Sequence, residues 1–251
     1  MNNLEKSIAA SKENFEAAFS EKNFYNKQTN DKSHLEAILD ILPIKSDMRI
    51  LDLGTGSGYL AFALANKYPK ATIIGLDIVE KALDQNRHSA KLDGLSNISF
   101  FTYNGITFPF ENRSFDMVVS RYALHQFPDI SKSISEVSRV LTDNGYFFIS
   151  DPTPNEEDIY GFVDEYMQVK TDGHIRFRSY SEWIAICKKS GFKFTDSFKS
   201  IIRFPRKYDK IYATIMNRYP KEIVNGYGIK TTKDEILITE QVNNILFCKG
   251  I

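Results

Sequence analysis

The sequence predicts an α/β fold in which helices cover both faces of a doubly wound, mostly parallel sheet. Residues 48–150 alternate short β-branched or aromatic runs with longer helical patterns, which is typical of βαβ units. The first run leads directly into a glycine-rich turn. With 251 residues, 42% of them hydrophobic, the chain can build one sizeable core, so we expect a single domain over residues 1–251.

Five short apolar runs predict the parallel strands. The right-handed crossover rule and the position of the glycine turn favour the spatial order 3-2-1-4-5 for these strands. The runs cover residues 49–53, 72–77, 98–102, 115–120 and 146–150.

Helical patterns connect these runs. The first pattern stops before Pro69, and the second stops at Gly94, where a left-handed C-cap costs least. The third ends at the turn signal Asn144-Gly145. The helices are expected over residues 60–65, 79–92 and 130–141.

The regions on either side of residues 46–151 are expected to cover that core. Residues 1–45 are predicted to form a helical lid, in which Ser33 and Glu36 make a capping box. Residues 152–251 are predicted to form two further strands, which give a seven-stranded sheet. They are also predicted to form an insert on the side where a second substrate, the acceptor, would bind. Their expected elements are a helix over 156–169, a helix opened by Ser179 and Glu182 and closed at Gly191, a strand over 192–203, a helix over 206–219 and a strand over 241–248.

Charge and cysteine content exclude several classes of protein. The 32 Lys and Arg residues balance the 32 Asp and Glu residues, so no overall field attracts nucleic acid or an anionic membrane. Cys187 and Cys248 lie far apart and lack metal-ligand spacing, so we expect neither a disulfide nor a metal site. The first residues lack the pattern of a secretory signal, and we expect a cytoplasmic protein.

The segment Gly54-Thr55-Gly56-Ser57-Gly58 follows the first predicted strand and precedes a helix. Such a turn allows a ligand close to the backbone and leaves N–H groups facing an anionic group such as a carboxylate or a phosphate. Glycines also serve plain tight turns, so the turn alone is weak evidence.

Polar residues follow the next two strands. Asp77 ends the second strand, where a carboxylate accepts hydrogen bonds from ribose hydroxyls; its alternative role is to cap the helix that begins near Val79. Asn104 follows the third strand and could pair with an adenine edge, although a turn-forming Asn before Gly105 explains it nearly as well. Together with the glycine turn, these residues favour a nucleoside ligand.

A nicotinamide dinucleotide is the weaker candidate for that nucleoside. Its fingerprint G-x-G-x-x-G needs a third glycine that allows close packing below a pyrophosphate. Here the third glycine comes one position early, at Gly58, and Tyr59 takes the expected place. The sequence also offers no separate second domain with a hydride-transfer acid.

With these motifs the sequence resembles the class I S-adenosylmethionine-dependent methyltransferases, most closely the ubiquinone/menaquinone-methyltransferase-like small-molecule branch (the methyltransferase type 11 domain). The resemblance covers about residues 30–151 and is looser beyond them. It implies a Rossmann-like sheet whose last strand is antiparallel. The motifs that carry it are Ile50-Leu-Asp-Leu-Gly-Thr-Gly-Ser-Gly58, Gly75-Leu-Asp77, Phe108-Pro-Phe110, Ser114-Phe-Asp116, Leu124-His125, Arg139-Val-Leu141 and Asn144-Gly145.

The resemblance implies S-adenosylmethionine as the cofactor. Asp52 would face its amino group, Asp77 would take the ribose hydroxyls and Arg121 would line the methionine side. Members commonly have Asp at the position of Asn104, but an amide oxygen can still accept from the adenine amine. The implied cofactor-binding residues are Asp52, Gly54, Thr55, Gly56, Gly58, Asp77, Ile78, Asn104, Gly105 and Arg121.

The implied reaction is in-line methyl transfer to a small molecule, for which the protein aligns the acceptor and excludes water. His125 is the first candidate for a general base and His174 the second, although both can be structural. Tyr25, Tyr122 and Arg176 are candidates for the acceptor side, whereas His34 and His88 are expected to be exposed helix residues. Acceptor atoms from oxygen to arsenic stay open, and a non-catalytic S-adenosylmethionine-binding module is the remaining alternative.

Overall fold

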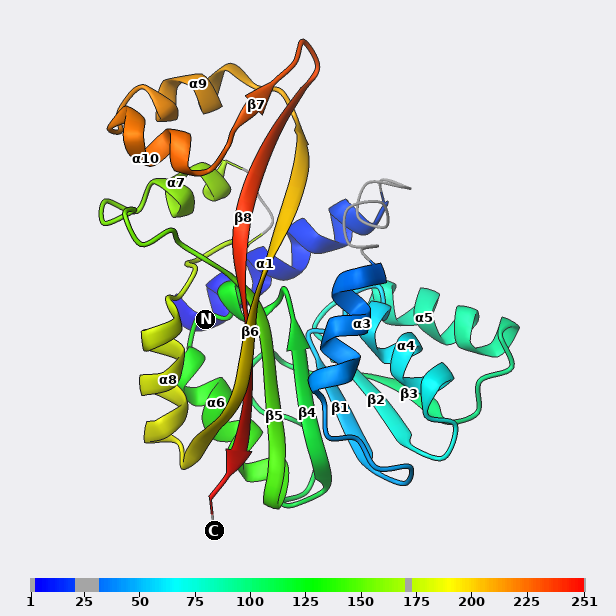
Figure 1. Ribbon diagram of the computed structural model, residues 1–251. Coiled ribbons are helices and arrows are strands. Elements are labelled where there is room, and N and C mark those ends of the chain that lie inside the picture. Colours follow the sequence, from blue (N-terminus) through cyan, green and yellow to red (C-terminus); the bar gives the residue numbers. More distant parts are fainter. Residues whose placement is uncertain (1–2, 21–31, 170–172, 251) are drawn as a thin grey trace.

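A computed structural model describes residues 3–20, 32–169 and 173–250, and in this part of the chain eight strands form one sheet (Figure 1). Their order is β3-β2-β1-β4-β5-β8-β6, with the short β7 paired to β8. The strands are β1 (Arg49–Leu53), β2 (Thr72–Asp77), β3 (Ile98–Thr102), β4 (Phe115–Arg121), β5 (Leu141–Thr153), β6 (Phe192–Lys207), β7 (Lys230–Thr231) and β8 (Glu235–Lys249).

The pairing confirms the predicted topology. Strands β1 to β5 are parallel neighbours in the order 3-2-1-4-5. Strand β8 is antiparallel to both β5 and β6, so the last strand lies inside the sheet and β6 forms its edge. The two-residue β7 is the one strand beyond the seven that the sequence predicts.

Helices cover both faces of the sheet, as predicted (Figure 1). On one face lie α6 and α8, and on the other lie α3, α4 and α5. The described helices are α1 (Asn3–Ser20), α3 (Lys32–Ile41), α4 (Tyr59–Lys67), α5 (Glu80–Leu92), the 3₁₀ turn η1 (Leu124–Gln126), α6 (Ile130–Val140), α7 (Phe162–Gln168), α8 (Tyr180–Lys189), α9 (Lys210–Met216) and α10 (Lys221–Gly226).

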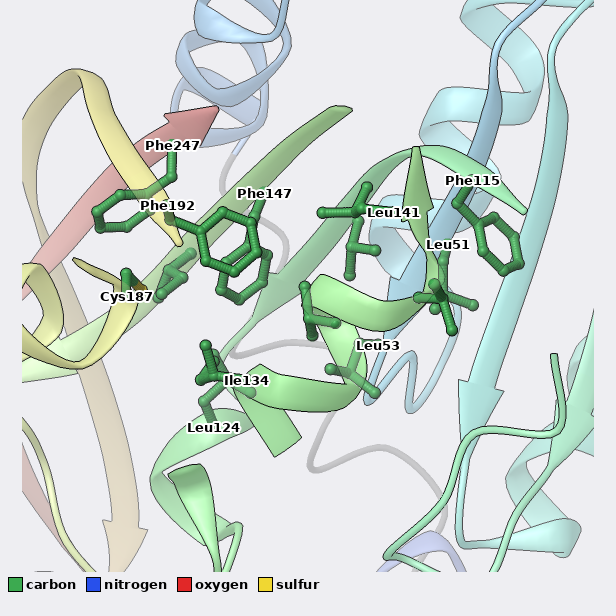
Figure 2. Close-up of a cluster of buried hydrophobic side chains, with 14 of the residues drawn as sticks. Leu51, Leu53, Phe115, Leu124, Ile134, Leu141, Phe147, Cys187, Phe192 and Phe247 are labelled. Carbon is green, nitrogen blue, oxygen red and sulfur yellow. The ribbon is translucent and has the colours of Figure 1, made fainter. Parts of the chain in front are cut away.

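Two apolar cores follow from the alternation of side chains along the strands. In the first, Leu51, Leu53 and Phe147 of the sheet pack against Ile134 of α6 and Cys187 of α8 (Figure 2). In the second, the alternate residues of the same strands, whose side chains point to the opposite face of the sheet, pack against α3, α4 and α5. Its members include Ile50, Ile73, Val119, Phe148, Ile38, Leu64 and Leu83.

A third core lies beyond the end of β5. Because Thr153 at that end pairs with Gln241, the first residues of β8 run past the parallel strands. There β8 packs against α7, α9 and α10, at the top of Figure 1. This third core therefore stands over the carboxyl ends of β4 and β5. It contains Phe162, Tyr166, Tyr212, Tyr227, Ile236 and Ile238.

The last two long strands, β6 and β8, are longer than predicted. Strand β6 continues through Pro205 to Lys207, so the helix predicted over 206–219 is wrong at its start, and α9 covers only Lys210–Met216. An edge strand tolerates proline, because one side of its backbone needs no ladder hydrogen bond. Strand β8 begins at Glu235 rather than at residue 241, since its start pairs with the end of β6.

Strand β5 also exceeds its prediction. It begins at Leu141 and absorbs the expected turn at Asn144, which adopts a left-handed φ of 62° where the register with β4 shifts. It continues through Pro152 to Thr153, three residues beyond the predicted end at residue 150. The acidic helix predicted from residue 156 begins only at Phe162.

Two capping boxes have different outcomes. At α8, Ser179 and Glu182 form the predicted box, each side chain accepting from the other residue's backbone N–H. At α3, the helix already begins at Lys32, so Ser33 lies in the first turn and not at the N-cap. No described helix is long and apolar enough to cross a bilayer.

Candidate functional site

A cavity opens at the carboxyl ends of β1, β2 and β4, where the sheet order reverses. Eight of the ten residues predicted for cofactor binding lie in its wall, from four separate loops. They are Asp52, Gly54, Thr55, Gly56, Asp77, Ile78, Gly105 and Arg121.

The glycine turn needs its glycines for two reasons. Gly54, Gly56 and Gly58 have φ values of 71°, 49° and 76°, in the left-handed region that disfavours other residues. A Cβ on Gly54 would also lie 2.4 Å from Cβ of Ala123. The turn is therefore pressed against the segment that follows β4, with its backbone exposed to the cavity.

Asp52 is a carboxylate at the bottom of the cavity, with 2% of the residue exposed. Its Oδ2 accepts a hydrogen bond from Thr55 Oγ1 at 2.7 Å. Burial raises the pKa of Asp52 from 3.8 to about 6, although the hydrogen bond from Thr55 and the charge of Arg121 act in the opposite direction. A buried carboxylate of this kind is stabilised by a cationic ligand.

Asp77 joins the glycine turn to the start of α5. Its Oδ2 accepts from Gly56 N at 2.8 Å, and its Oδ1 accepts from Val79 N at 3.0 Å. Burial raises the pKa of this carboxyl group, and the backbone N–H donors oppose the rise. Val79 is the N-cap residue of α5 and makes no side-chain cap hydrogen bond, so Asp77 binds the backbone N–H of the N-cap residue and does not cap the helix itself. Its carboxylate also lines the cavity.

Arg121 supplies a cation on the same wall. Its guanidinium carbon lies 4.5 Å from the ring centroid of Tyr59 and 4.1 Å from that of Tyr122. Two aromatic contacts hold the planar guanidinium in one orientation. The cavity thus presents a carboxylate at Asp52 and a guanidinium at Arg121, which suits a zwitterionic group.

Gly58 and Asn104 lie outside the cavity wall. Gly58 is the N-cap of α4 and faces Phe62 and Asn86. Asn104 Oδ1 accepts from the backbone N–H groups of Ile106 and Thr107, each at 2.9 Å, which is the turn-forming role.

Sequence reasoning missed other wall residues. Ile8 comes from α1, and Gln126, Phe127 and Pro128 come from the segment after β4. Tyr103 lies beside Gly105 at the end of β3. The position of Tyr59, directly after the glycine turn, was the one usable signal; the others depend on which side of a loop faces inward.

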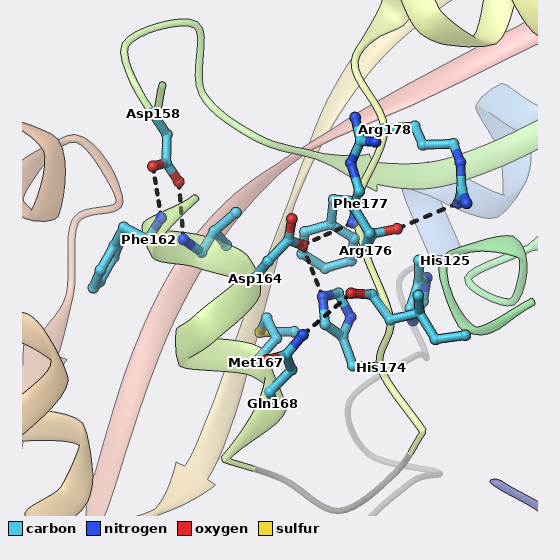
Figure 3. Close-up of polar contacts among 12 residues, drawn as sticks. His125, Asp158, Phe162, Asp164, Met167, Gln168, His174, Arg176, Phe177 and Arg178 are labelled. Carbon is cyan, nitrogen blue, oxygen red and sulfur yellow. Dashed lines mark hydrogen bonds and ion pairs between the residues drawn. The ribbon is translucent and has the colours of Figure 1, made fainter. Parts of the chain in front are cut away.

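His125 and His174 lie next to each other (Figure 3). His125 Nδ1 is 2.9 Å from Asp151 Oδ1, His174 Nε2 is 2.8 Å from Asp164 Oδ1, and the two ring centroids are 5.4 Å apart. Neither imidazole lines the cavity, although the neighbouring Gln126 does.

The carbonyl of His125 accepts from the N–H groups of Ile175 and Arg176, so it ties the insert to η1. Exposed Arg176 forms an ion pair with Glu182 of α8 and braces that helix. Tyr122 lines the cavity, whereas Tyr25 lies outside the described residues. His88 is exposed as expected, but the same expectation for His34 is wrong, because only 6% of that residue is exposed.

The sequence matches the methyltransferase domain family over residues 44–200, which is more than half of the chain. The chain belongs to this family. The match spans the glycine turn, Asp77, Arg121, His125 and His174.

Three known proteins illustrate the similarity. The uncharacterized methyltransferase YcgJ of Bacillus subtilis is 30% identical over 166 residues, which are 66% of this chain and 64% of that protein. Its crystal structure has a TM-score of 0.76 at 24% identity, covering 88% of this chain and 100% of that chain. A demethylmenaquinone methyltransferase of Thermus thermophilus is 31% identical over 50% of this chain and 56% of its own length.

The third is a phosphoethanolamine N-methyltransferase 2 of Haemonchus contortus, solved in complex with S-adenosyl-L-methionine. It has a TM-score of 0.64 at 18% identity and covers 98% of this chain and 57% of that chain. In sequence, the chain spans less than two thirds of the length of the curated relatives named above.

The contact between Gly54 and Ala123 gives a first prediction. Gly54→Ala adds a Cβ at a φ of 71° and 2.4 Å from Ala123 Cβ, so we expect a loss of more than about 2 kcal/mol of unfolding free energy in urea titrations. Gly94→Ala is the matched control: its φ is 66°, but no atom lies within 4 Å, so it should lose only about 1 kcal/mol. Equal losses would contradict the close packing of the turn.

The pKa of Asp52 gives a second prediction. Because this pKa is raised from 3.8 to about 6, the folded protein holds the proton more tightly than the unfolded chain does. The carboxylate therefore lowers stability as pH rises from about 4 to above 6. Asp52→Asn should be more stable than wild type at pH 8, by about 1–3 kcal/mol, and this advantage should vanish towards pH 4. The free energy of unfolding of both proteins, measured at pH 4, 6 and 8, tests this prediction. A stability advantage of Asp52→Asn that grows towards pH 4 would contradict it.

Proposed function

We propose that this protein transfers a methyl group from S-adenosylmethionine to a small-molecule acceptor, with S-adenosylhomocysteine as the other product. The observation that carries the proposal is the combination of opposite charges beside an exposed glycine backbone: Asp52 and Arg121 complement an amino-acid zwitterion, and Asp77 stands two strands from Arg121 for a ribose diol. Membership of the methyltransferase domain family supports the same cofactor.

The residues present fit this cofactor. The backbone of Gly54 and Gly56 and the carboxylate of Asp52 would hold the methionine end, with Arg121 facing its carboxylate. The two oxygens of Asp77 would take the ribose hydroxyls, and Ile78 would pack against adenine. When bound, the cofactor supplies a methyl group activated by a sulfonium. The Asn104 contact to adenine stays a prediction, since its Oδ1 already accepts two backbone N–H groups.

The chain itself orients the reactants and excludes water. Ile8, Tyr59 and Phe127 give the cavity apolar surfaces, which lower the local dielectric around the charged groups. The apolar third core stands over the neighbouring strand ends, on the side away from Asp77. We infer that the acceptor enters between this third core and the Tyr122 side of the cavity.

His125 is our candidate for a general base. Its imidazole is oriented by Asp151, which is the arrangement that a base needs, and it directly precedes the wall residue Gln126. His174, held by Asp164 and packed with Phe177 against His125, supports that imidazole in this proposal. Arg176 is engaged with Glu182, so its acceptor role is the weakest of these proposals.

Cofactor binding tests the proposed function. Isothermal titration of the purified protein should show micromolar binding of S-adenosylhomocysteine and no binding of NAD⁺. Asp77→Asn keeps the shape but removes one charged acceptor, so affinity should fall at least about tenfold. Asp93→Asn, at an exposed Asp after α5, is the control and should bind like wild type. Unchanged affinity in Asp77→Asn would refute the ribose assignment, and tight NAD⁺ binding would favour an oxidoreductase.

The base hypothesis has its own test. With any acceptor that a panel of small phenols, amines, thiols and carbon acids identifies, His125→Ala should lower turnover about 10²–10⁴-fold and remove a pH-dependent limb near neutrality. His88→Ala, an exposed histidine on α5, should keep the wild-type rate. Full turnover of His125→Ala between pH 6 and 9 would leave that residue a structural role. A protein that binds cofactor and methylates nothing in the panel would favour the binding-module alternative.

A further inference from the structure

A chain of buried and partly buried hydrogen bonds connects helix α3 to the cavity wall. His34 Nδ1 lies 3.2 Å from the hydroxyl of Tyr122, and His34 Nε2 lies 3.0 Å from Asn244 Oδ1. Asn244 belongs to β8, the strand between β5 and the edge strand β6, and Tyr122 follows β4. His34 thus joins three segments that are remote in the sequence.

The partners of Asn244 fix the direction of these hydrogen bonds. Its Nδ2 faces Ser200 Oγ at 2.9 Å and the carbonyl of Val242 at 3.5 Å, and a carbonyl only accepts. Asn244 Oδ1 therefore accepts from His34, which carries its proton on Nε2. In the neutral imidazole the other nitrogen, Nδ1, is then an acceptor, to which the Tyr122 hydroxyl donates.

Tyr122 is a residue that needs such an anchor. Its φ of 54° lies in the left-handed region, which costs a residue with a Cβ about 1 kcal/mol or more. The guanidinium of Arg121 also lies over the ring of Tyr122, with its carbon 4.1 Å from the ring centroid. A displacement of the ring would therefore move the cation that faces the amino-acid end of the cavity.

We propose that His34 is a positioning residue for cofactor binding, which acts through Tyr122 to hold Arg121 in place. The inference rests on the proposed function, because it concerns the cation that would face the cofactor's carboxylate. His34 stacks on the ring of Tyr122 at 5.9 Å between centroids, and Phe198 of β6 packs against its edge at 6.3 Å. Packing and hydrogen bonding thus fix the imidazole on both sides.

Two ligands separate this role from a general effect on the cavity. S-adenosylhomocysteine carries the amino-acid carboxylate, whereas 5′-methylthioadenosine has the same nucleoside and sulfur without the amino acid. Tyr122→Phe removes one oxygen atom and His34→Leu removes the acceptor at similar size. Each should weaken S-adenosylhomocysteine about three- to tenfold in isothermal titration, with the affinity for 5′-methylthioadenosine unchanged.

The double variant and a control complete the experiment. Because Tyr122→Phe breaks only the hydrogen bond that His34→Leu also breaks, the double variant should lose no more affinity than His34→Leu alone. His88→Leu, an exposed histidine on α5, should bind both ligands like wild type. Should His34→Leu fail to fold, Tyr122→Phe alone still decides.

Three results would overturn the proposal: unchanged affinity for S-adenosylhomocysteine in Tyr122→Phe, equal losses for both ligands, or additive losses in the double variant. Failure of the proposed function is a different result. In that case the wild-type protein itself would bind neither ligand.

Discussion

The site depends on burying two carboxylates, Asp52 and Asp77, at the ends of adjacent parallel strands. Burial raises the pKa of both groups, so each costs stability in the folded chain without a cation or a set of donors. The backbone N–H groups of Gly56 and Val79 provide part of the compensation for Asp77, and Thr55 and Arg121 provide it for Asp52. A cationic amino group and a sugar diol would supply the remainder.

Four of the five parallel strands could be predicted from the sequence almost to the residue, whereas β5 extends beyond its prediction at both ends. Strands β1, β2 and β3 have the expected bounds, because each is a short apolar run bounded by polar or turn-forming residues. The predictions for the antiparallel pair β6 and β8 were too short, mainly at the end of β6 and at the start of β8. The outer part of this pair is stabilised by pairing and by the third core, neither of which leaves a local pattern at Pro205 or Glu235.

The candidate site could be predicted where it is built from backbone turns, and less well where it is built from packing. The glycine turn and Asp77 follow strands directly, so topology alone places them at one edge. His34 could not be placed, because its burial comes from Tyr122, Phe198 and Asn244, which join it only in the folded chain. Asn104 was predicted at the site but does not line the cavity, because its side chain accepts hydrogen bonds from the backbone of its own turn.

The position of β8 has a consequence for how the polypeptide matures. This strand is made after β6, yet it lies between β5 and β6. While the ribosome is still translating β8, the backbone of β5 therefore has an open edge, and β6 has no ladder to join. An open edge of this kind is a template for mispairing between nascent chains. Charged residues along β6, such as Lys193, Lys199 and Arg203, would oppose mispairing of this strand with another chain until β8 is complete.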